Sequence, residues 1–143
     1  MIYCGRRGAG YATKLLNQHV KYAWYLASAE ALLVAKQLGL DPDAVATAVQ
    51  QCSGGDSGLA TAAKYFRDDA AGMATHAPAS TIEKDVVLAE AMANTAGVRS
   101  RTLGVVVDFF LDVSTTPYRQ RPYPESCELL EELRTMPRQV GDR

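Results

Sequence analysis

The feature that most constrains this chain is a glycine turn followed by a long segment without helix breakers. Gly5, Gly8 and Gly10 lie within six residues, which favours a tight, backbone-exposed turn. From Tyr11 to Leu38 the sequence contains no Gly or Pro and is rich in Ala, Leu and Lys. It therefore predicts one helix of about 28 residues, roughly 42 Å long at ~1.5 Å per residue, around which the other segments must pack.

Apolar residues recur along this helix at steps of three and four. They are Ala12, Leu15, Leu16, Val20, Ala23, Trp24, Ala27, Ala31, Val34, Ala35 and Leu38. This spacing predicts a broad apolar face that belongs to the core. On one side of the first two turns, Lys14, Asn17, Gln18 and Lys21 form a polar row, which is either a solvated edge or one wall of a site.

The rest of the chain predicts further helices. Asp41 is a suitable N-cap with Pro42 at the first helical position, and Ser80 or Thr81 is a candidate N-cap further on. The expected helices after the first are 42–52, 59–71, 81–96, 102–114 and 125–135, with connections at 72–79 and 115–124. The run from Val105 to Phe110 favours a strand by propensity, but its apolar spacing and length favour a helix. The sequence predicts an all-α fold of about six helices around a long central helix.

Composition narrows the class of protein. The 143 residues suffice for one domain, and the net charge of −1 gives no basic footprint for a nucleic acid. No apolar run reaches the ~20 residues of a membrane span and no signal peptide is recognisable. Cys4, Cys52 and Cys127 are scattered, and His19 and His76 have no partner at ligand spacing. We expect a cytoplasmic protein with reduced thiols, no metal site, and no nucleic-acid or membrane partner.

The glycine turn does not predict a dinucleotide site within this chain. Thr13 stands where the fingerprint needs its third glycine, and Glu30, the acidic residue at the right distance, lies in the same predicted helix. Lys14 is a better candidate for chemistry, because a lysine held on a rigid helix can exchange a proton with a substrate carbonyl or hydroxyl. Spacing alone favours a solvated lysine there, and a solvated charge pair at Lys84-Asp85.

Two motifs together are similar to a known family. The first is Gly5-x-x-Gly8-x-Gly10-x-x-x-Lys14-x-x-Asn17-Gln18. The second is Ile82-x-Lys84-Asp85-x-x-Leu88-Ala89, followed by Ala96-Gly97-Val98. In this order and separation they resemble the β-hydroxyacid dehydrogenases, which include 3-hydroxyisobutyrate dehydrogenase, tartronate semialdehyde reductase and, more distantly, 6-phosphogluconate dehydrogenase. The resemblance extends from residue 2 to about residue 135.

The resemblance implies a fold and roles for particular residues. Lys14 matches the family's catalytic acid/base, Asn17 and Gln18 match its substrate-binding amides, and Lys84 and Asp85 match positions beside the cofactor, NAD or NADP. In the family this helical domain packs against an N-terminal Rossmann domain and commonly mediates dimerisation. A small hydroxy acid is the implied substrate.

Departures from the family pattern shape the remaining expectations. The Rossmann domain is absent, so we expect residues 1–4 to be its stub, 5–136 the helical domain and 137–143 a polar tail. The chain alone should then be inactive and bind no cofactor tightly, its partner being a second copy or a separate Rossmann chain. Segment 118–125 lacks the usual Gly and Asp residues, which leaves the substrate open. The alternative is a stand-alone helical module for dimerisation or ligand binding.

Overall fold

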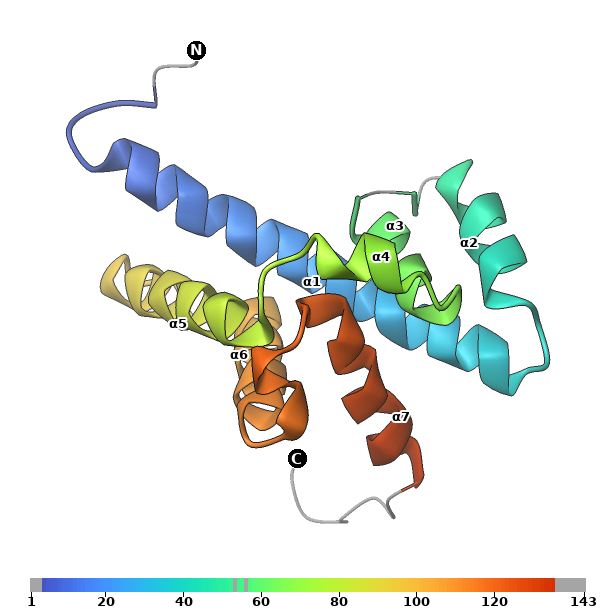
Figure 1. The fold of residues 1–143 in the computed structure, drawn as a ribbon. Coiled ribbons are helices and arrows are strands. Elements are labelled where there is room, and N and C mark those ends of the chain that lie inside the picture. Colours follow the sequence, from blue (N-terminus) through green and yellow to red (C-terminus); the bar gives the residue numbers. More distant parts are fainter. Residues whose placement is uncertain (1–3, 53, 56, 136–143) are drawn as a thin grey trace.

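The computed structural model describes residues 4–52, 54–55 and 57–135, and this part of the chain contains helices and no strand (Figure 1). The elements are α1 (Ala9–Gln37), α2 (Pro42–Gln50), α3 (Ser57–Phe66), α4 (Ala70–Ala74), α5 (Ala79–Thr95), α6 (Arg101–Ser114), the 3₁₀ helices η1 (Pro117–Gln120) and η2 (Tyr123–Ser126), and α7 (Cys127–Thr135). The predicted all-α fold is confirmed. Apart from Cys4, the expected stub and the tail at 137–143 lie outside the described residues.

The long helix α1 crosses the whole domain (Figure 1). It begins after Gly8, whose φ of 96° favours glycine. Gly39 stops the helix just beyond its C-cap, Leu38. There the Leu40 amide donates to the Ala35 carbonyl (3.0 Å) and the Gly39 amide donates to the Lys36 carbonyl (3.1 Å), which is the hydrogen-bond pattern of a Schellman motif. Helices α2, α3 and α7 lie beside its C-terminal half, and α5 lies along its N-terminal half (Figure 1). The predicted length and C-terminal stop are therefore confirmed.

The predicted buried face of α1 is wrong. Its buried apolar residues are Leu15, Tyr22, Tyr25, Leu26, Ala29, Leu32, Leu33 and Ala35. Of the predicted set only Leu15 and Ala35 are buried, and the large residues Leu16, Val20, Trp24, Val34 and Leu38 are between 44% and 71% exposed. Apolar residues lie on both sides of α1, so periodicity alone did not identify the side that packs.

The predicted helix 59–71 is two helices. The helix is interrupted at Asp68, whose φ of 55° is left-handed. Asp69 then caps α4, because its side chain accepts a hydrogen bond from the Gly72 amide (2.8 Å). Aspartate tolerates the left-handed conformation, which explains the interruption at Asp68. An aspartate side chain also competes for backbone amides, which explains the cap at Asp69. Gly72, expected in a connection, is consequently helical.

The N-termini of the later helices were predicted only in part. Asp41 caps α2 as expected, and α6 is a helix, capped by Ser100, whose hydroxyl accepts from the Leu103 amide (3.2 Å). No side chain caps α5, which follows Pro78, so Ser80 and Thr81 are not its N-cap. The expected loop 115–124 contains η1 and the start of η2, and α7 begins at Cys127 instead of Glu125.

One buried hydroxyl ties α1 to the C-terminal elements. Tyr25 is fully buried, and its hydroxyl lies 3.0 Å from the Tyr123 carbonyl and 3.2 Å from the Pro124 carbonyl. Its ring packs edge-on against Tyr123 at a centroid distance of 5.0 Å. Burial raises the pKa of Tyr25 well above its usual value, so it remains a hydrogen-bond donor, and η2 is held on α1.

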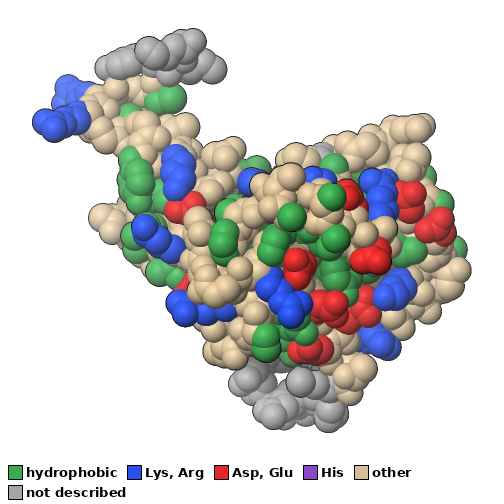
Figure 2. Space-filling view, in the orientation of Figure 1, with side chains coloured by type: hydrophobic (Ala, Val, Ile, Leu, Met, Phe, Trp, Pro, Cys, Tyr) green, Lys and Arg blue, Asp and Glu red, His purple; other side chains and the backbone are tan. Residues whose placement is uncertain are grey.

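The distribution of charged side chains on the surface is consistent with the net charge of −1. On the face drawn in Figure 2, acidic and basic side chains are interspersed over α7 and its neighbours. No helix in the described part of the chain is long and apolar enough to cross a membrane. Of the three cysteines, which are free thiols, Cys127 is buried, and Cys4 and Cys52 are exposed.

Candidate functional site

The two sequence motifs meet at one carboxylate. The Lys14 ammonium on α1 lies 2.7 Å from Asp85 Oδ1 on α5, and the Gln18 side-chain amide donates to Asp85 Oδ2 at 2.8 Å. Lys14 and Gln18 are one helical turn apart, so both point to the same side of α1. Residues 71 positions apart in sequence are thereby joined at the α1–α5 interface.

The carboxylate is buried while the ammonium is partly open. Asp85 is 6% exposed, whereas the Lys14 side chain is 49% exposed. Burial alone would raise the pKa of Asp85, but the hydrogen bonds from Lys14 and Gln18 and the charges of Lys14 and Lys84 lower it below its usual value. Asp85 is therefore a fixed anion that positions a lysine whose outer side remains accessible to a ligand.

The other two predicted site residues are not joined to this centre. Asn17 and Lys84 are both exposed, and within the described part of the chain neither has a side-chain hydrogen bond or ion pair to Lys14, Gln18 or Asp85. Asn17 directly precedes Gln18 and Lys84 directly precedes Asp85 in the sequence. Both therefore lie beside the centre, and their polar groups are available to solvent or to a ligand.

Sequence reasoning left out two residues that lie near this centre, Lys21 and Tyr123. Lys21, one turn beyond Gln18, is partly buried and burial lowers its pKa. Its Nζ lies 5.1 Å from the ring centroid of Tyr22 and 5.5 Å from that of Tyr123. Lys21 stands in the polar row of α1 and could have been included from its spacing, whereas Tyr123 lies in a segment where no periodicity pointed to it.

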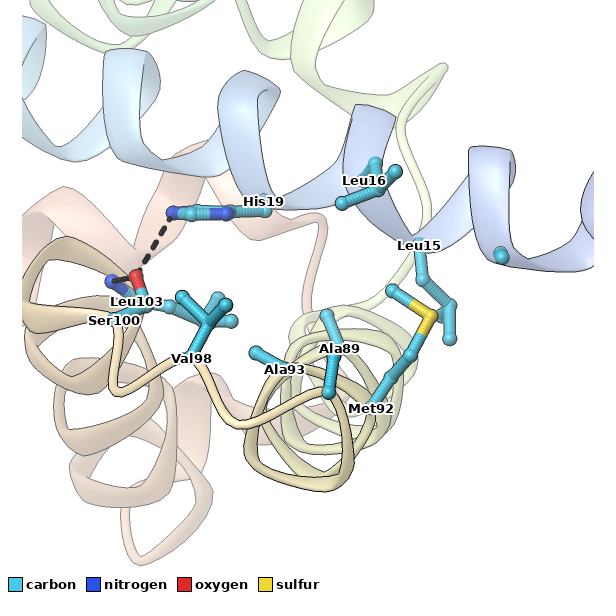
Figure 3. Close-up of a pocket in the computed structure, with 11 residues that line it drawn as sticks. Leu15, Leu16, His19, Ala89, Met92, Ala93, Val98, Ser100 and Leu103 are labelled. Atoms are coloured by element: carbon cyan, nitrogen blue, oxygen red, sulfur yellow. Dashed lines mark hydrogen bonds between the residues drawn. The ribbon is translucent and has the colours of Figure 1, made fainter.

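A separate apolar cavity of about 490 Å³ lies further along the same interface (Figure 3). Its lining residues come from α1, α5, the segment between α5 and α6, and α6 itself: Ala12, Leu15, Leu16, His19, Ala89, Met92, Ala93, Ala96, Val98, Ser100 and Leu103. Its polar edge is a contact of 3.5 Å between His19 Nε2 and Ser100 Oγ. Lys14, Gln18 and Asp85 do not line it, so this cavity and the polar centre are different features.

The described residues do not fit a whole dinucleotide. They form no β-α-β unit, the structure that cradles a pyrophosphate behind a glycine-rich turn. Within the same residues, no group of three or more His, Cys, Asp or Glu side chains could hold a metal ion.

Comparison with solved structures identifies the fold. A 3-hydroxyisobutyrate dehydrogenase from Mycobacterium tuberculosis, solved with L-serine, matches with a TM-score of 0.80 and 20% identity over 90% of this chain. One from Salmonella typhimurium matches with a TM-score of 0.75 and 18% identity over 85% of it. The matched regions are 46% and 42% of those two proteins, so this chain spans less than half of their length.

Comparison with protein families identifies the relationship. No curated protein matches the sequence. The family model described as the NAD-binding domain of NADP-dependent 3-hydroxyisobutyrate dehydrogenase matches residues 8–119, which include Lys14, Asn17, Gln18, Lys84 and Asp85. This is most of the chain, and it agrees with the fold and with the resemblance of the two motifs. The chain belongs to this family of NAD(P)-dependent, 3-hydroxyisobutyrate dehydrogenase-type domains.

Proposed function

We propose that this chain is the substrate-facing helical domain of an NAD(P)-dependent oxidoreductase that acts on the CH–OH group of a small 3-hydroxy acid. The observation that carries the proposal is the pairing of Lys14 with Asp85 at 2.7 Å. The pair joins the two motifs of the family, and it fixes a proton donor at a partly open surface. The family model supports the cofactor class, and the substrate class is our inference.

In this proposal Lys14 is the acid/base group. Its ammonium donates a proton to the carbonyl oxygen when the substrate is reduced, and its neutral amine accepts the hydroxyl proton in the oxidation direction. Asp85 and Gln18 act as positioning residues, because both of the carboxylate's hydrogen-bonded oxygens face α1. Asn17 is exposed and its amide is available for the substrate oxygens.

The cofactor requires a second structural unit. When bound, the nicotinamide supplies the hydride chemistry, with Lys84 as the residue of this chain beside it. Since the described helices do not fit the dinucleotide, we propose that residues 5–136 work with a Rossmann domain, on the same polypeptide or on another, and are inactive alone. The two solved relatives, each about twice as long as the matched region, are consistent with such a partner.

A second copy of the chain is the other proposed partner. On the side of α1 opposite its buried face, exposed apolar residues follow alternating steps of four and three. They are Val20, Trp24, Ala27, Ala31, Val34 and Leu38, a spacing typical of a helix–helix seam. We expect sedimentation velocity to give a dimer that Val34→Lys dissociates and that Leu133→Lys, an exposed apolar site on α7, leaves intact. A monomer at high concentration would contradict this partner.

Activity with and without a Rossmann domain tests the function. The chain is assayed alone and together with a separately produced Rossmann domain of a 3-hydroxyisobutyrate dehydrogenase, with NAD and NADP, across small 3-hydroxy acids. We expect turnover only in the combination, loss of at least about 100-fold in Lys14→Met, and no change in Lys36→Met, which removes the same charge elsewhere on α1.

Fluorescence titration with NADH and NADPH separates the alternatives. Tight stoichiometric binding to the chain alone would contradict the need for a Rossmann partner. Absence of turnover in every combination, with a folded dimer, would favour the stand-alone helical module.

A further inference from the structure

Two basic side chains contact the ring of Tyr123, and a third contacts one of them. Lys21 on α1 has its Nζ 5.5 Å from the ring centroid, and the His76 ring, after α4, packs edge-on at 5.1 Å. Lys64 on α3 completes the group, because its Nζ lies 3.0 Å from His76 Nε2. An ammonium only donates hydrogen bonds, so His76 accepts this one and is neutral in this arrangement.

Among the described residues, no acidic side chain forms an ion pair with this basic cluster, defined as Lys21, Lys64 and His76. Over residues 4–52, 54–55 and 57–135, neither Lys21 nor Lys64 makes an ion pair. Burial and the charges of Lys64 and Lys21 lower the pKa of His76. The buried carboxylate on this side of α1, Asp85, is already engaged by Lys14 and Gln18. Partly buried like charges without a counter-charge favour the binding of an anion.

The hydroxyl of the Tyr123 ring, which Lys21 and His76 contact, points to the same conclusion. Tyr123 is 1% exposed, and within the described part of the chain its hydroxyl oxygen has no hydrogen-bond partner. The Thr61 hydroxyl lies close by and donates to the Ser57 carbonyl (2.8 Å). Its oxygen is still able to accept a hydrogen bond, but it makes none of normal geometry with Tyr123. A buried hydroxyl without a partner is uncommon in folded proteins unless a ligand or a water satisfies it.

We propose that Lys21, Lys64, His76 and the Tyr123 hydroxyl form a binding site for a carboxylate or phosphate group. The site is distinct from the Lys14–Asp85 pair, since in the described part of the chain no hydrogen bond, ion pair or ring contact joins its members to either residue. It lies beside that pair, however, because Lys14, Gln18 and Lys21 follow one another at steps of four and three on the same face of α1. Lys14 and Lys21 are seven residues apart, which is roughly 10 Å along the helix axis.

This position suggests which ligands reach both sites. If the proposed function holds, a hydroxy acid with a second acidic group would place its reacting oxygen at Lys14 and its distal anion in the basic cluster. The anion site itself rests only on the cluster and on Tyr123, so it stands or fails independently of dehydrogenase activity. Free phosphate offers the same chemistry, and the experiment separates the two sources.

The test is an NMR titration of the His76 imidazole in the full chain, with His19→Gln used to assign the two histidine signals. Inorganic phosphate, malate with two carboxylates and 3-hydroxybutyrate with one are the probes. We expect phosphate and malate to raise the pKa of His76, because a bound anion offsets the two lysine charges. Lys21→Met and Lys64→Met should each weaken this binding about tenfold or more. Lys36→Met, the same change farther along α1, should leave it unchanged.

Two results would overturn the proposal. One is an unchanged His76 titration at saturating phosphate and malate in a chain that circular dichroism shows to be folded. The other is an equal response in the wild type and both lysine variants. Lys14→Met identifies the source of the anion: a larger loss for malate than for phosphate supports a substrate that spans both sites, and equal retention of the two supports a site for free anions.

Discussion

Lys14 and Asp85 are joined across the α1–α5 interface by a 2.7 Å ion pair in which the carboxylate is buried and the ammonium is half exposed. The asymmetry assigns different roles to the two residues. Asp85 is held by two donors and cannot turn toward a ligand without breaking them. Lys14 keeps one side open, as the proposed proton transfer requires.

Asp85→Asn is expected to test the positioning role directly. The variant keeps the shape of the side chain but removes the charge that holds Lys14. Because Lys14 is half exposed and its charge is partly screened, we expect the free energy of unfolding to fall by only about 1 kcal/mol. Urea denaturation measures this, with the exposed Asp108→Asn on α6 as the matched control. A loss as small as the control's would contradict the role of Asp85.

The same residue predicts an acid-sensitive stability. The folded-state pKa of Asp85 lies below its usual value, so its stabilising contribution is complete above the unfolded-state pKa of about 4. The contribution is lost as the pH falls from there through the folded-state pKa. The difference in unfolding free energy between the wild type and Asp85→Asn should therefore shrink below about pH 4. A difference that grows on acidification would have the wrong sign.

His76 predicts an effect closer to neutrality. Burial, Lys64 and Lys21 lower its folded-state pKa, so between that value and the unfolded value of about 6.5 the unfolded chain binds more protons. Stability should fall as the pH drops through this window, by at most about 1 kcal/mol per pH unit. Urea midpoints at about pH 7.5 and 5.5 should differ more in the wild type than in His76→Gln. Equal differences would contradict this account of His76.

The sequence predicted those parts of the fold that depend on interactions between neighbouring residues. The stop at Gly39 and the start at Asp41-Pro42 follow from a left-handed C-terminus, a capping carboxylate and a fixed φ, which depend on neighbouring residues alone. The packed side of α1 was not predictable, because apolar residues lie all round it and tertiary contacts select Tyr22 and Tyr25 over Val20 and Trp24. The break at Asp68 also has no periodic signal.

The candidate site was predictable only through the resemblance. Spacing alone favoured a solvated Lys14 and a solvated Lys84-Asp85 pair, and neither motif indicates that Lys14 and Asp85 touch. Their contact depends on how α1 and α5 pack. Lys21 and Tyr123 were missed for the same reason: the cluster is assembled from α1, α3 and segments near η2 that are distant in sequence.

Tyr25→Phe should show how much the buried hydroxyl contributes. The variant keeps the ring contact with Tyr123 but leaves the Tyr123 and Pro124 carbonyls without this donor. We expect the free energy of unfolding to fall by about 1–2 kcal/mol. Tyr11→Phe, at a tyrosine that is 55% exposed, should change it by less than about 0.5 kcal/mol. Equal effects of the two substitutions would show that the Tyr25 hydrogen bonds contribute nothing.

Two helical glycines should respond to alanine in opposite directions. A Cβ at Gly58 on α3 would lie 2.7 Å from the Tyr25 amide nitrogen and 2.8 Å from the Trp24 carbonyl carbon, so the two helices would have to separate. At Gly104 on α6 the nearest atom would be a Glu90 carboxylate oxygen, 3.8 Å away. We expect Gly58→Ala to destabilise the domain by about 2 kcal/mol or more through overpacking. Gly104→Ala should stabilise it by about 0.5–1 kcal/mol, because alanine is the better helix former. Thermal denaturation of both variants measures the pair, and a Gly58→Ala variant as stable as the wild type would contradict the close approach of α3 to α1.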